Sequence, residues 1–330
     1  MKNILKTVGG IITFALIILS INFWGRLVRP TETDSAFWTI NTFHDLPEDS
    51  IEIIIYGSSI AWRGMNVMEM YENYGIAAYN YGCNWQNINT TLLFVQDSLR
   101  TQSPKVIAIE TTQVNTIFKD RDMDGQIYYT KAIGESLEKY KFLKGCFGND
   151  IERWVSYYMP ICAFHDNWIN LNRDSFTNYD DKATTSTFYN TMGFMSLDWV
   201  NPIELRDWKT FPQFELDENV VCILDELVRT CKKNDIDIIF YTAPAAPEYY
   251  YFDAMKSYAA ENECVYINFY EKIEEIGIDG QTDFSDEGHL NENGATKLAD
   301  YLGRFIVANY EVTDMRQYEG NPWQAALDME

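Results

Sequence analysis

The 330-residue chain has few histidines and few basic side chains. It contains 3 histidines, and 49 aspartates and glutamates outnumber its 26 lysines and arginines, which gives a formal net charge of -23. A surface of this charge repels phosphate backbones, so nucleic-acid binding is disfavoured as the main function. Direct docking of the folded part on anionic lipid is disfavoured for the same reason.

Paired cysteines of the kind that bind zinc are absent. None of the 6 cysteines forms a Cys-x-x-Cys pair, and no cluster has the spacing of zinc ligands. Cys222 and Cys264 lie in apolar helix or strand contexts, so we expect buried thiols there. The sequence predicts no metal site, and it does not choose partners for any disulfide.

Long apolar runs are rare, and the prominent one lies near the N-terminus. The uncharged stretch Val8–Trp24 is preceded by Lys2 and Lys6 and followed by Arg26 and Arg29. Its length is at the lower end for a membrane-spanning helix. Because no small-x-small cleavage site follows, we predict an uncleaved signal anchor rather than a cleaved signal peptide or a buried helix. The flanking charges are balanced, so they do not set the orientation.

Short β-rich runs alternate with helical segments along the rest of the chain. The runs are Ile51–Tyr56, Ala77–Tyr81, Lys105–Glu110, Ile236–Tyr241 and Cys264–Asn268. Thr90–Arg100, Glu218–Lys233 and Tyr249–Asn262 have helical spacing. This alternation indicates βαβ units, and near-continuous apolar strands indicate burial on both faces. We predict a three-layer α/β/α, flavodoxin-like fold with five parallel strands.

Composition changes along the chain predict its organisation. We expect a membrane anchor at 1–29, a polar tether at 30–50, an α/β domain at 51–310 and a loosely packed tail at 311–330. Residues 116–215 interrupt the βα alternation and are rich in aromatic side chains, which indicates a mostly helical insertion. These aromatics either form the insertion's own core or stack on sugar rings.

Two short motifs can assemble a serine nucleophile with its base. Gly57-Ser58-Ser59 directly follows the first apolar run, and Asp286-x-x-His289 lies near the other end of the chain. The carboxyl end of a central strand is where open α/β sheets bind ligands. Asp286 can orient the ring of His289 so that its Nε2 faces the Ser59 hydroxyl. The alternatives are a strand-ending turn and a surface loop in which Asp286 caps a helix.

Four other polar residues have less specific assignments. Arg63 follows Ser59 by four positions and can meet an anionic group of a substrate, or it is a solvated helix residue. His165 can bind substrate, or it is a hydrogen-bonded structural histidine. His44 lies in the predicted tether, and Asp283 is expected to support the site rather than to orient His289.

Together these segments resemble the SGNH (GDSL-like) hydrolase superfamily. Ser59 matches the nucleophile of its first block, and Asp286 and His289, followed by Leu290-Asn291 and Gly294, match its last block. The run Tyr79–Gln86 resembles the second block, which supplies a backbone N–H to the oxyanion hole. The family usually has glycine where Trp85 stands, so we expect a different local turn.

The third block of that superfamily, Gly-x-Asn-Asp, is not intact in this chain. The sequence reads Glu110-Thr111-Thr112-Gln113-Val114-Asn115, so Asn115 or Gln113 is left as a candidate side-chain donor to the oxyanion. Because loss of such a donor typically costs about 10²–10³ in rate, efficient generic esterase activity is not expected.

An N-terminal anchor with this pattern is similar to envelope members of the superfamily, which include the D-alanyl-lipoteichoic acid transfer protein and alginate O-acetyltransferase-like proteins. The resemblance covers roughly residues 50–115 and 235–308. It implies an extracytoplasmic O-acyltransferase or esterase that acts on an envelope polysaccharide or teichoic-type polymer and needs no metal or organic cofactor. A membrane acyltransferase is the implied protein partner. An anchored glycan- or partner-binding protein without turnover, and a cytosolic esterase, are the alternatives.

Overall fold

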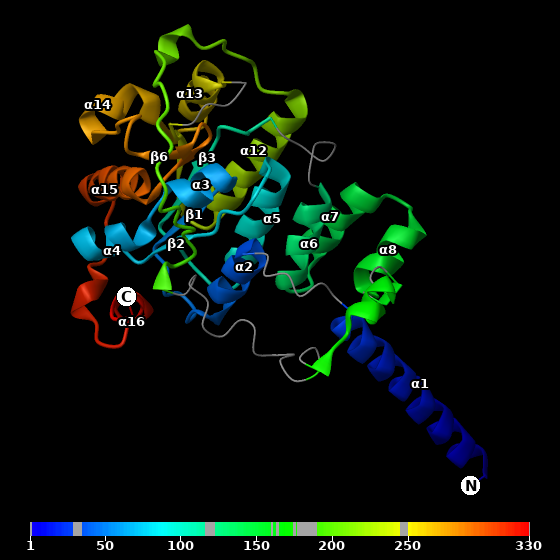
Figure 1. The fold of residues 1–330 in the computed structure, drawn as a ribbon. Coiled ribbons are helices and arrows are strands. Elements are labelled where there is room, and N and C mark those ends of the chain that lie inside the picture. Colours follow the sequence, from blue (N-terminus) through cyan, green and yellow to red (C-terminus); the bar gives the residue numbers. More distant parts are fainter. Residues whose placement is uncertain are drawn as a thin grey trace. The chain divides into compact units, whose positions relative to one another are not determined.

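Figure 1 shows a computed structural model of the chain. The structure describes residues 2–28, 35–115, 123–159, 161–162, 165–173, 176, 190–244 and 250–329. Internal contacts divide the chain into two compact units. The smaller unit consists of residues 1–34 and 143–185, and the larger unit consists of residues 35–142 and 186–330.

A five-stranded parallel sheet forms the centre of the larger unit, with the strand order β2-β1-β3-β4-β5 (Figure 1). The strands are β1 (Ile53–Tyr56), β2 (Ala78–Asn80), β3 (Val106–Glu110), β4 (Asp237–Thr242) and β5 (Val265–Asn268). Every residue of β1 and β3 is buried, as strands covered on both faces require. The predicted fold class is confirmed, and each strand lies within one or two residues of its predicted bounds.

Helices cover both faces of this sheet. The chain runs from β1 to β2 in one direction and from β2 to β3, β4 and β5 in the other, so right-handed crossovers place the two sets of helices on opposite faces. On one face α4 (Val67–Tyr74) packs against α15 (Glu292–Asn309). On the other face α5 (Ile88–Ser98) packs against α12 (Glu218–Lys233).

Shorter elements complete the larger unit. They are α3 (Ser59–Gly64), α6 (Met123–Tyr129), η1 (Thr130–Ala132), η3 (Trp208–Thr210), α13 (Phe252–Glu261), η4 (Phe269–Lys272), α14 (Ile273–Ile276), η5 (Met315–Gln317) and the hairpin strands β6 (Phe284–Asp286) and β7 (His289–Leu290). Tyr258 on α13 donates a hydrogen bond to Asp225 on α12 over 2.9 Å, which ties these two helices together.

The segment expected to be a tether contains a packed helix, α2 (Ser35–Asp45). Phe43 of α2 is fully buried and stacks on Tyr81, with ring centroids 4.5 Å apart. His44, which had no predicted role, has its Nε2 2.9 Å from a carboxylate oxygen of Asp97 on α5. Residues 35–45 therefore belong to the folded unit.

Two further expectations are wrong. The C-terminal tail is not loosely packed, because Trp323 of α16 (Pro322–Leu327) is fully buried and its indole N–H donates to Ala78 O on β2. Cys222 is exposed rather than buried, because α12 turns Val220 and Leu224 toward the sheet and Cys222 away from it. Cys264 is partly buried.

The smaller unit contains α1 (Lys2–Leu27), α8 (Ile151–Tyr158) and η2 (His165–Asn170), and α7 (Leu137–Phe147) ends within it. The segment Lys6–Gly25 of α1 is long and apolar enough to be a membrane anchor or a signal sequence. Its side chains are exposed along almost the whole segment, so the alternative of a buried helix is wrong.

Candidate active site

The turn after β1 presents Ser59. Gly57 has φ of +149°, and a Cβ on it would lie 2.6 Å from the Cβ of Glu110 and 2.8 Å from the Cβ of Ala61. Only glycine fits this turn, because a side chain would collide with its neighbours in addition to the backbone strain. Ser58 then caps α3 by accepting a hydrogen bond from the Ile60 N–H over 3.3 Å. Ser59 is the first residue of α3, at the carboxyl end of β1.

The β6–β7 hairpin carries Asp286 and His289, the residues predicted to be the orienting acid and the base. Asp286 pairs with His289 across the hairpin, and the Gly288 N–H donates to Asp286 Oδ1 over 2.7 Å. The hairpin is held in turn by Trp199, whose indole N–H donates to Ser285 O over 2.9 Å. Its position is therefore fixed by contacts outside the Asp-x-x-His motif.

The two motifs meet although they are far apart in the sequence. His289 Nε2 lies 2.8 Å from Ser59 Oγ, and its Nδ1 lies 2.9 Å from each carboxylate oxygen of Asp286. The order of contacts is hydroxyl, imidazole, carboxylate, which is the arrangement of a nucleophile, a general base and the group that orients the base. The structure thus brings together the three residues predicted to be catalytic.

The local charges favour the ionised form of Asp286. Partial burial by itself raises the pKa of Asp286, but hydrogen bonds from His289 and Gly288 and the charges of His289 and Arg63 outweigh that effect, so the pKa is lowered. Burial lowers the pKa of Arg63, and the Asp286 carboxylate opposes this shift. Arg63 is thus half-buried beside the triad, and its buried Nε has no hydrogen-bond partner among the described residues.

Asp283 supports the hairpin and does not contact His289. It is fully buried, forms an ion pair with Lys297 over 2.7 Å, and accepts a hydrogen bond from Asn293 over 2.5 Å. Burial alone raises the pKa of Asp283, but the bonds from Lys297, the Asp279 N–H and Thr282 lower it overall. This carboxylate fixes the start of α15 behind the hairpin.

The segment after β2 lies against the nucleophile turn. The Cys83 N–H donates to Gly57 O over 3.2 Å, and the Asn80 amide donates to Ala61 O and Met65 O over 2.9 Å each. Trp85 has φ of +55° and is 44% exposed. Trp85 thus adopts the left-handed conformation that glycine favours. Sequence reasoning missed Asn80, whose position at the end of a strand was the available signal.

The polar residues of the segment Glu110–Asn115 make contacts within the fold. Asn115 donates to Glu215 O over 2.9 Å and accepts from the Asp217 N–H over 3.1 Å, so its amide joins the start of α12 and not the triad. Glu110, which had no predicted role, is buried next to Gly57 and accepts hydrogen bonds from the N–H and the hydroxyl of Thr112. Burial raises the pKa of Glu110 to about 7. The polar residue at the end of an apolar strand was the signal for it.

The last candidate residue, His165, lies in the smaller unit. His165 is in η2 of the smaller unit, and its side chain lies outside the described residues. Within the described ranges, no group of three or more histidines, cysteines, aspartates or glutamates is placed to hold a metal ion.

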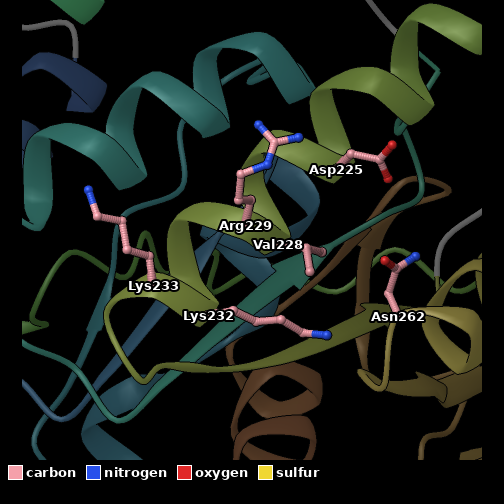
Figure 2. A pocket seen from close by; sticks show the side chains of 6 residues that line it. All are labelled: Asp225, Val228, Arg229, Lys232, Lys233 and Asn262. Atoms are coloured by element: carbon pink, nitrogen blue, oxygen red, sulfur yellow. The ribbon is translucent and has the colours of Figure 1, made fainter.

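A surface hollow of about 610 Å³ lies beside α12 (Figure 2). It is lined by Asp225, Val228, Arg229, Lys232, Lys233 and Asn262. Arg229 is paired with Glu226, and Lys232 lies 3.4 Å from Glu263. The hollow contains neither a nucleophile nor a triad residue, so it is not part of the candidate active site.

Comparison with known proteins adds little to this geometry. No family model matches the chain, and no curated protein matches it. Among solved structures, a similar one is the crystal structure of a "putative acylhydrolase" from Bacteroides fragilis NCTC 9343. It is 11% identical over 85% of this chain and 97% of that chain, with a TM-score of 0.39. Likeness at that level carries no inference about function, which therefore rests on the residues of this chain.

Proposed function

We propose that this chain is a serine-dependent acyl-ester enzyme of the SGNH type, an O-acyltransferase or esterase. The observation that carries the proposal is the continuous chain of contacts from Ser59 Oγ through His289 to Asp286, each 2.8 or 2.9 Å long. Structural histidines do not need a serine hydroxyl on one ring nitrogen and a carboxylate on the other, whereas nucleophilic catalysis does.

In the first half-reaction, Ser59 Oγ attacks the acyl carbonyl carbon while His289 Nε2 takes the hydroxyl proton. Asp286 holds the ring and stabilises the imidazolium that forms. The negative charge on the former carbonyl oxygen is held by backbone N–H groups, for which Ser59 and Trp85 are the candidates. The tetrahedral adduct then collapses, the C–O bond to the leaving alcohol breaks, and His289 returns the proton to that alcohol.

In the second half-reaction, an acceptor attacks the acyl-serine ester. His289 removes a proton from the acceptor oxygen, the acyl group moves to that oxygen, and Ser59 recovers its proton. Water as acceptor gives an esterase, and a sugar or polyol hydroxyl gives an O-acyltransferase. We propose the latter class of substrate, an envelope polysaccharide or teichoic-type polymer, because α1 has the length and composition of a membrane anchor.

The position of Arg63 favours a polymer substrate that carries negative charge near its acyl ester. Its guanidinium is half-buried beside Asp286, and the buried Nε has no hydrogen-bond partner among the described residues. An anionic group of the substrate would pair with the part of the guanidinium that is not buried. We also propose that the folded part of the chain lies on the outer side of the membrane. A membrane acyltransferase is the proposed donor of the acyl group.

A fluorophosphonate probe tests the proposed chemistry, because it reacts with activated serines. We expect the full-length protein in detergent micelles to be labelled at Ser59, and Ser59→Ala to abolish the labelling. Ser58→Ala is the matched control, since Ser58 points its hydroxyl at the Ile60 N–H, and this variant should still be labelled. Labelling that survives in Ser59→Ala would sink the assignment.

An anchored protein that binds glycan or a protein partner without turnover is the competing proposal. It is favoured by Asn115, whose amide is bonded to residues 215 and 217 rather than placed at the triad. Under this alternative the protein is not labelled at all, yet it retains binding to the isolated envelope polymer.

A further inference from the structure

The smaller unit carries four exposed apolar side chains, Ile151, Val155, Trp168 and Ile169, which we call the ridge. Ile151 is 74% exposed and Val155 is 39% exposed, and their i, i+4 spacing places them on one side of α8. Trp168 and Ile169 of η2, in the same unit, are 70% and 75% exposed. Large apolar side chains that are this exposed within one small unit mark an interaction surface.

The other side of α8 already has its own packing. Phe147 lies edge-on to Trp154 and Tyr157, with ring centroids 5.1 and 5.8 Å away, and Tyr157 is buried. Arg153 donates to Cys146 O over 3.1 Å. Trp154 and Tyr157 thus pack around Phe147, while Ile151 and Val155 are left exposed.

The unit that carries the ridge also contains the candidate membrane span. Its only two parts are residues 1–34 and residues 143–185. The apolar span of α1 ends at Gly25, and the next described side chains, Leu27 and Val28, are buried. The folded part of the unit therefore begins within two or three residues of the end of the span, where a spanning helix leaves the hydrocarbon.

Aromatic residues mark the same end of α1. Phe23 and Trp24 are 48% and 43% exposed, and tryptophan is enriched at membrane–water boundaries. Helices α8 and η2, in the same unit, are thereby expected at the level of the headgroups. An amphipathic helix at that level buries its apolar side about 5–10 Å into the boundary with the acyl chains.

We propose that the ridge formed by Ile151, Val155, Trp168 and Ile169 is inserted in the surface of the bilayer that α1 crosses. The occupant is the apolar boundary of the phospholipid layer rather than its anionic headgroups. Helices that depend on anionic lipid are rich in lysine and arginine, whereas α8 has one arginine and one glutamate. The proposal requires α1 to be retained as an anchor, and it is independent of the serine chemistry.

Photo-crosslinking from a genetically encoded benzophenone side chain tests this arrangement. The probe replaces Trp168 in the full-length chain, reconstituted in phosphatidylcholine nanodiscs, and adducts are identified by mass spectrometry after irradiation. The matched control replaces Val200 of the larger unit, which is 53% exposed. We expect at least tenfold more phospholipid adduct from position 168 than from position 200.

Each other product would overturn the proposal. Covalent dimers from position 168 would show that a second copy covers the ridge, and crosslinks to residues of the larger unit would show that the ridge folds back onto it. A probe at Phe14 must give lipid adducts, since α1 does not span the membrane otherwise and the ridge has no bilayer beside it. Adducts at position 168 that form only with phosphatidylglycerol would overturn the apolar assignment.

A probe at Ile151 repeats the test from α8 in case position 168 perturbs η2. We expect the same phospholipid adducts there, with yields within about twofold between phosphatidylcholine and phosphatidylglycerol nanodiscs.

Discussion

The carboxyl ends of β1 and β3 are neighbours in the sheet, with Tyr56 in register with Ile109, but they have different roles. After β1 the chain turns sharply at Gly57, and Ser59 faces an imidazole. After β3, Glu110 bonds to Thr112, and its Cβ occupies the space that Gly57 leaves free. One strand end carries the proposed nucleophile, Ser59, and the other packs behind it through Glu110.

The largest effect is expected from a change of Asp286, the carboxylate proposed to orient His289. Asp286→Asn keeps the shape of the side chain but favours the wrong tautomer of His289, so we expect the rate of fluorophosphonate labelling to fall by about 10⁴. Glu287→Gln removes an adjacent, exposed negative charge and should change the rate less than threefold. Equal losses in both variants would mean that net charge, and not orientation of the ring, controls Ser59.

The contact between the two strand ends gives the second prediction. Gly57→Ala places a Cβ 2.6 Å from Glu110 Cβ and adds strain at φ of +149°, so the free energy of unfolding should fall by about 2–5 kcal/mol. Gly320→Ala, at φ of +74° with no neighbour within 4 Å, should lose only the strain, about 1–2 kcal/mol. Chemical unfolding in detergent micelles compares the two. Similar losses would show that Glu110 yields to the added methyl group.

Glu110, which packs behind the proposed nucleophile, predicts that the free energy of unfolding depends on pH. Burial raises the pKa of Glu110 from 4.5 to about 7, so the folded state binds the proton more tightly than the unfolded state. The stabilisation is complete below pH 4.5 and is lost as the pH rises through about 7, a difference of about 3 kcal/mol. Unfolding at pH 5 and pH 8 should show this loss in the wild type, and Glu110→Gln should lack it. An identical pH dependence in both proteins would contradict the shift.

The sequence predicted the features that repeat along the chain or depend on a local motif. All five strands follow from buried apolar runs, and the triad follows from two motifs with fixed chemistry. Helices α2 and α16 were missed because each is short and is held by few buried apolar side chains, Ile40 and Phe43 in α2 and Trp323 and Ala326 in α16. So short a segment shows little periodicity, and the contacts that bury these side chains are tertiary.

The conformation of Trp85 was also beyond the sequence, because partners outside its own turn hold it. The Cys83 N–H donates to Gly57 O, and Gln126 donates to Asn84 O over 2.9 Å, so the two residues that precede Trp85 are held by distant residues. Local propensity alone disfavours a left-handed tryptophan.

Trp85 therefore gives a prediction with a small effect. Trp85→Gly keeps the backbone N–H and removes the strain of φ of +55°, so the free energy of unfolding should rise by about 1 kcal/mol while the labelling rate stays within threefold. Trp85→Val should lower stability by about 1–3 kcal/mol, because a β-branched side chain opposes positive φ. A large loss of labelling in the glycine variant would show that the indole, and not the N–H, serves the site.

Asn115→Ala has a similarly small expected effect, and it tests whether the segment after β3 serves only a structural role. Its amide bonds both Glu215 O and the Asp217 N–H, so Asn115→Ala should lower the free energy of unfolding by about 1–2 kcal/mol but change the labelling rate less than threefold. Gln113→Ala is the companion variant, because Gln113 is the other donor in the incomplete third block. A loss of about 10²–10³ in labelling for Asn115→Ala at unchanged stability would instead make its amide an oxyanion donor. In that case the segment after β3 would present a reactive group as the segment after β1 does, and the contrast between the two strand ends would fail.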